Sequence, residues 1–106
     1  MKTIAYHKMV RDRIPEVIAR DGKKAVWHTV DRQEAMEFLT KKLREEAEEY
    51  AASREAEELA DVLEVVRALA AEQGVSWDEL ERIRENKHLQ RGGFQQRIVL
   101  DAVEIP

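Results

Sequence analysis

The sequence has no cysteine, only two prolines and four glycines, and few aromatic residues, which make up 6% of it. The absence of cysteine excludes disulfide bridges, thiolate zinc sites and a cysteine nucleophile. Proline and glycine punctuate turns, so their scarcity predicts long elements joined by few turns. With so few aromatic side chains, we expect neither a sandwich fold nor a base-stacking surface for nucleic acid.

Charge and hydrophobicity narrow the class of protein. Charged residues make up 38% of the chain and hydrophobic residues 43%, which excludes both a disordered chain and a membrane span. The net charge of −4 argues against binding to nucleic-acid polymers, which needs clustered cations. The first residues, MKTIAYHKMVRDR, lack the apolar core of a signal peptide, so we expect a cytoplasmic protein without membrane association.

We expect a single domain over residues 1–106, because the chain is short and has no linker or internal repeat. Turn and capping signals predict four helices: from Pro15 to just before Gly22, from a cap at Asp31 to about Ala52, from about Glu55 to Gln73 before Gly74, and from a capping box at Ser76 and Glu79 to about Gln90 before Gly92. Residues 24–30 and 97–104 are rich in apolar side chains and predict two short paired strands. The expected fold is mainly α, an antiparallel helical hairpin with a small two-stranded β element.

Acidic residues of the second predicted helix fall on different sides of it. At about 100° per residue, Glu46 lies about 20° from Leu39, inside an apolar stripe, and Glu49 lies on the edge of that stripe. Glu45 and Glu48 point towards solvent instead. One pair of this acidic run is therefore aimed inward and the other outward.

The third predicted helix carries a matching pair. Glu58 lies within its apolar stripe and Asp61 flanks that stripe. In an antiparallel hairpin that turns at residues 53–54, Glu46 pairs with Asp61 and Glu49 pairs with Glu58. Four carboxylates thus reach two levels about 5 Å apart.

Four carboxylates held this close repel one another, and a divalent cation would relieve the repulsion. Magnesium takes oxygen ligands and keeps waters that a phosphate can replace. The sequence therefore predicts a site for magnesium, or alternatively manganese, and its ligands are Glu46, Glu49, Glu58 and Asp61. Two plainer readings are a solvated acidic surface and intrahelical salt bridges, such as that of Lys42 with Glu46 or Glu45.

Two groups of basic residues are candidates to bind phosphate oxygens beside the metal. Lys8, Arg11 and Arg13 cluster before the first predicted helix, and Lys87 and Arg91 share a face of the fourth. The alternative is that these are ordinary exposed cations, which also favour the C-terminal ends of helices.

The acidic pattern resembles a known family. Glu45-Glu46-x-x-Glu49 followed by Glu58-x-x-Asp61 resembles the signature of the MazG-like, all-α nucleoside triphosphate pyrophosphohydrolases. Three further blocks, residues 6–15, 57–65 and 91–94, are similar to the small phosphoribosyl-ATP pyrophosphohydrolase-like branch of that superfamily. The resemblance runs from about Tyr6 to Leu100.

This resemblance implies a magnesium-dependent hydrolase that splits an α–β phosphoanhydride of a nucleotide into a monophosphate and pyrophosphate. It implies metal binding by Glu46, Glu49, Glu58 and Asp61, and association into dimers or higher oligomers. Wide apolar stripes on the second and third helices independently predict at least a homodimer, in which two hairpins complete a four-helix bundle.

The catalytic candidates are Glu46, Glu49 and Glu45, and either Glu49 or a neighbour such as Glu45 would orient the attacking water. Two alternative functions stay open. One is a true phosphoribosyl-ATP pyrophosphohydrolase of histidine biosynthesis. The other is a non-catalytic helical module that binds a nucleotide or a partner protein. Metal-dependent release of pyrophosphate discriminates between an enzyme and a binding module.

Overall fold

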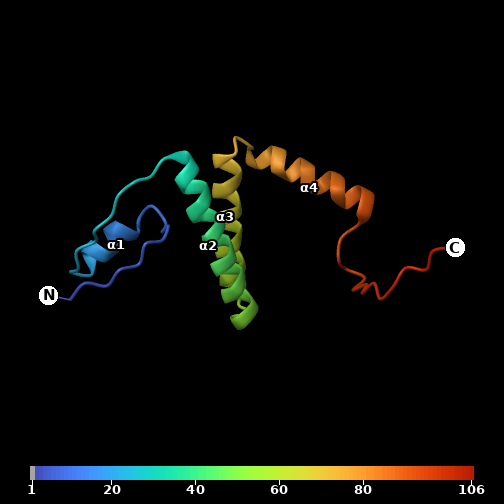
Figure 1. Ribbon diagram of the computed structural model, residues 1–106, viewed down its shortest axis with the longest axis horizontal. Coiled ribbons are helices and arrows are strands. Elements are labelled where there is room, and N and C mark those ends of the chain that lie inside the picture. The colour runs from blue at the N-terminus through green and yellow to red at the C-terminus, as the bar shows by residue number, and fades with distance from the viewer. Residues whose placement is uncertain (1) are drawn as a thin grey trace. The chain divides into compact units, whose positions relative to one another are not determined.

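The computed structural model describes residues 2–106. The chain divides into two compact units, and the boundary in the sequence lies between Val75 and Ser76. The first unit holds α1 (Ile14–Arg20), α2 (Arg32–Ser53) and α3 (Ala56–Glu72), and the second holds α4 (Trp77–Arg91) (Figure 1). The prediction of a mainly α fold is confirmed. Within residues 2–106, no helix is long and apolar enough to cross a membrane.

The centre of the first unit is a hairpin of α2 and α3, which lie side by side (Figure 1). The turn between them is short because Arg54 adopts a left-handed backbone conformation (φ 60°) and donates its N–H to the carbonyl oxygen of Tyr50 at 2.7 Å. The N–H of Glu55 then donates to Ser53 Oγ at 3.2 Å. The predicted break at residues 53–54 is therefore confirmed.

Local capping signals fix the other helix ends. The Asp31 carboxylate accepts a hydrogen bond from the Glu34 N–H at 2.9 Å, and Ser76 Oγ accepts one from the Glu79 N–H at 3.1 Å. Each bond satisfies a backbone donor that has no partner within its helix. Gly74 follows α3 in a left-handed conformation (φ 75°) that glycine adopts without strain. The four predicted helices are confirmed to within one or two residues at most ends.

The buried apolar side chains of the described residues are few and come from the hairpin: Ala35 and Leu39 on α2, and Val65 and Ala70 on α3. The one buried charged residue among them is Glu46 on α2. Such a small core makes each large apolar side chain in it important. It also makes the buried carboxylate of Glu46, in the interface between α2 and α3, unusual.

The predicted β element is wrong for the described residues, because neither 24–30 nor 97–104 forms a strand. Val26 is 89% exposed, and Arg97 begins the second segment in a left-handed conformation (φ 58°) that interrupts an extended chain. Apolar composition favours a strand only where a neighbouring strand supplies a ladder and a packing surface. These segments are irregular chain without a ladder.

The size of the core gives a test of the hairpin. Replacement of the buried Leu39 by alanine removes the largest apolar side chain of this core, so we expect a loss of about 2–5 kcal/mol in the free energy of unfolding. Leu89→Ala, at a position that is 76% exposed, should cost less than about 1 kcal/mol. Chemical denaturation measures both, and equal losses would contradict this description of the core.

Candidate metal centre

Glu46 lies in the interface between α2 and α3, and the residue is only 7% exposed. Its Oε1 is 3.4 Å from the Nζ of Lys42, one helical turn earlier on α2. Its Oε2 is buried and is the one such side-chain atom, among the described residues, with no hydrogen-bond partner. A buried carboxylate oxygen without a partner is costly, and this atom is available to a ligand.

Two carboxylates of α3, those of Glu58 and Asp61, lie close to the carboxylate of Glu46. Single oxygen atoms of Glu46, Glu58 and Asp61 all lie within 4.8 Å of one another, and the two α3 residues are partly buried. Residues three apart share a helix face, so Glu58 and Asp61 both turn towards α2. Three converging carboxylate oxygens, one of them buried, form the donor set that a hard divalent cation such as magnesium prefers.

The electrostatics of the cluster disfavour its own negative charges. Burial raises the pKa of Glu46, and the neighbouring Glu49 carboxylate raises it further, whereas the Lys42 ammonium lowers it. Partial desolvation raises the pKa of Glu58, and the charges of Asp61 and Glu46 add to the rise. The carboxylates are thus held together by the fold against their mutual repulsion.

The structure separates the two remaining acidic candidates from the three converging carboxylates. Glu49 is exposed and lies close enough to Glu46 to affect its pKa, but it is not one of the three. Glu45 instead pairs with Lys8, whose Nζ is 2.8 Å from Glu45 Oε1. This hydrogen bond lowers the pKa of Glu45 and raises that of Lys8.

Two of the N-terminal cations, Lys8 and Arg11, form ion pairs with carboxylates of the hairpin. Besides the pair of Lys8 with Glu45, the Nη2 atom of Arg11 is 2.7 Å from Asp61 Oδ1. The sequence analysis predicted neither pair, because the partners are 37 and 50 residues apart and the chain has many charges of both signs. In the sequence, these ion pairs are indicated only by the excess of acidic residues and by the small basic cluster near the N-terminus.

The three other basic candidates are exposed. Arg13 is the residue that immediately precedes α1, and it is exposed. Lys87 and Arg91 are exposed on α4, four residues apart, in the second unit. The phosphate-binding roles of these three residues stay predictions.

The intrahelical salt bridge considered above, Lys42 with Glu46, is present. It engages one oxygen of Glu46 and leaves Oε2 without a partner. It also gives no reason for Glu58 and Asp61 to converge on the same place. The ion pair therefore accompanies the cluster and does not explain it.

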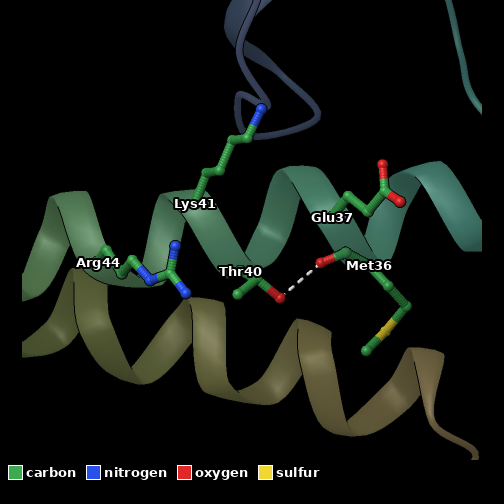
Figure 2. A pocket seen from close by; sticks show the side chains of 5 residues that line it. All are labelled: Met36, Glu37, Thr40, Lys41 and Arg44. Carbon is green, nitrogen blue, oxygen red and sulfur yellow. Dashed lines mark hydrogen bonds between the residues drawn. The ribbon is translucent and has the colours of Figure 1, made fainter.

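A shallow hollow on α2 is distinct from this cluster. Its lining residues are Met36, Glu37, Thr40, Lys41 and Arg44 (Figure 2). The Thr40 hydroxyl donates to the carbonyl oxygen of Met36 at 2.7 Å and is thus already used within the helix. The hollow lacks convergent acidic groups, so the carboxylate cluster is the candidate functional site.

Comparison with known proteins assigns no family. No family model, no curated protein and no solved structure matches the chain. The indications of function therefore come from the carboxylate cluster and from the motifs that supply its residues.

The raised pKa of Glu46 gives a test by stability. Since folding disfavours the ionised form of Glu46, its neutral isostere in Glu46→Gln should raise the melting temperature of the metal-free protein by a few degrees at neutral pH. Glu48→Gln, on the exposed side of α2, should leave it unchanged. Calorimetry in the presence of a chelator measures both variants.

The same comparison has a defined pH dependence. A carboxyl with a raised pKa destabilises the fold above that pKa, and the cost is relieved as the pH falls through it towards the ordinary value of 4.5. The stability difference between Glu46→Gln and wild type should therefore shrink as the pH is lowered. A difference that grows on acidification would contradict the stated direction.

Proposed function

We propose that this chain is a magnesium-dependent nucleotide pyrophosphohydrolase, which cleaves the α–β phosphoanhydride of a nucleotide to a monophosphate and pyrophosphate. The observation that carries the proposal is the buried, unpartnered Oε2 of Glu46 in a residue that converges with Glu58 and Asp61. The choice of reaction rests on the resemblance of the surrounding motifs to those of MazG-like enzymes.

The residues present fit a magnesium ion. Glu46, Glu58 and Asp61 would hold it, with Glu49 as a fourth acidic neighbour, and manganese accepts the same oxygen donors. When bound, the ion would polarise a phosphoryl oxygen and neutralise charge that develops on it. The unpartnered Oε2 gives the buried end of the site a donor that no protein group uses.

The charge of the site also fits a divalent ion. Its four carboxylates face two cations, Lys42 beside Glu46 and Arg11 beside Asp61, so about two negative charges stay uncompensated. Burial and, to a lesser extent, neighbouring carboxylates raise the pKa values of Glu46 and Glu58 despite these two cations. A divalent cation would offset most of this negative charge.

The remaining acidic residues suit a role at the attacking water. Glu49 is exposed beside the cluster, so its carboxylate can accept a hydrogen bond from a water next to the substrate. Glu45 is a weaker proton acceptor while Lys8 lowers its pKa. We therefore favour Glu49 as the residue that orients the water. Cations from Lys8, Arg11 and Arg13 would supply contacts to the phosphates. Phosphate binding by Lys87 and Arg91 on α4 stays a separate proposal.

Activity is tested by release of pyrophosphate from a panel of nucleotides, including phosphoribosyl-ATP, with and without magnesium. Glu46→Gln and Asp61→Asn should each lower turnover at least about 100-fold, because loss of a ligand costs more than loss of a supporting group. Glu48→Gln should retain activity. Nucleotide binding without turnover would instead indicate a non-catalytic module, and turnover by Glu46→Gln close to wild type would refute the site.

We infer that two copies of the chain associate through their hairpins. Leu59 and Leu63, one turn apart on α3, are 49% and 50% exposed. Exposed apolar ridges on helices are usually covered by a partner. A second hairpin would complete the four-helix bundle that the sequence predicts.

Oligomeric state is measured by light scattering at low micromolar concentration. The wild type should have at least twice the mass of one 12.3 kDa chain, and a Leu59→Asp, Leu63→Asp double variant should shift towards one chain. Leu89→Asp, on exposed α4 surface, is the control and should keep the wild-type mass. A fully active wild type with the mass of one chain would contradict the association.

A further inference from the structure

Arg11 is bound to one of the three carboxylates that converge at the candidate metal centre. Its guanidinium donates from Nη2 to Asp61 Oδ1 at 2.7 Å, and Nη1 is 3.9 Å from Glu64 Oε1, one turn further along α3. Both partners of the short contact are accessible, with exposed side-chain fractions of 55% for Arg11 and 40% for Asp61. The contact can therefore open without unpacking the hairpin.

A guanidinium and a divalent cation compete for the same carboxylate. Arg11 partly neutralises Asp61 and so weakens its attraction for a metal, and the two positive charges would repel each other across one side chain. Exposed ion pairs are weak, so a metal held by three carboxylates can displace the guanidinium at a small cost. The segment that carries Arg11 precedes α1 and is not part of a helix.

We propose that Arg11 is a built-in counter-ion that holds Asp61 until a divalent cation enters, and that metal entry releases its guanidinium to bind substrate phosphate. The inference rests on the proposed function for the identity of the metal and substrate. Metal loading and formation of the phosphate-binding surface become one event. An enzyme without metal then lacks both its ligand set and one of its phosphate cations.

Lys8 provides a matched comparison. It belongs to the same N-terminal segment and forms an ion pair of similar length, 2.8 Å, but its partner Glu45 is outside the three converging carboxylates. Removal of either cation lowers the positive charge near the site by one. Only removal of Arg11 also removes a competitor for a metal ligand.

The experiment is calorimetric titration of the full chain with Mg²⁺ alone, and then of the Mg²⁺-loaded chain with inorganic pyrophosphate as the phosphate probe. Arg11→Met should bind Mg²⁺ about two- to fivefold more tightly than wild type, in line with loss of one exposed ion pair. Lys8→Met should change the Mg²⁺ affinity less. Arg11→Met should also bind pyrophosphate several-fold more weakly, and that loss should be confined to the Mg²⁺-loaded protein.

Each other outcome overturns the inference in a recognisable way. Unchanged or weaker Mg²⁺ binding by Arg11→Met means that Arg11 shares Asp61 with the metal or supports its geometry. Equal tightening by Arg11→Met and Lys8→Met means that only the general charge matters. Failure of the proposed function itself is distinct, because Mg²⁺ would then bind neither wild type nor Arg11→Met. Circular dichroism of each variant checks that the helices are retained.

Discussion

The Glu46 carboxylate occupies a position in the α2–α3 seam where an apolar side chain would stabilise the hairpin better. Complete burial of a leucine-sized group contributes about 1.5–3 kcal/mol, whereas an ionised carboxylate there raises the free energy of the fold. Glu58 and Asp61 add negative charge at the same level. Lys42 and Arg11 offset this repulsion in part, and one oxygen of Glu46 still has no partner. A fold with so small a core tolerates this cost, which the cation site that we propose would explain.

The hairpin serves two purposes on different faces. The seam near the turn gathers the carboxylates, and the ridge of Leu59 and Leu63 is left half exposed. A second hairpin packed against that ridge would bury apolar surface, and this burial would offset the stability lost by placing Glu46 in the interface. Stability and function are then linked, since the association that we infer would also hold the helices that position the metal ligands.

Local rules predicted much of this arrangement. The caps at Asp31 and Ser76 and the break after Ser53 depend on neighbouring residues, and the inward position of Glu46 follows from helical periodicity. The expected strands failed because strand pairing depends on distant partners that these segments do not have. The expected pairing of residues across the turn at 53–54 gave the level of Glu49 along the hairpin but not its distance from the α3 carboxylates. The pair of Arg11 with Asp61 spans 50 residues and had no local signal.

The central claim is that Glu46, Glu58 and Asp61 form one site for a divalent cation. Anomalous diffraction from crystals of the full chain grown with Mn²⁺ tests it most directly, because manganese takes the oxygen ligands of magnesium and can be located by its own scattering. The account predicts an anomalous peak about 2 Å from oxygen atoms of all three residues, with the Oε2 of Glu46 among them. A fully bound manganese ion at another place, with that Oε2 hydrogen-bonded to a protein group, would contradict it.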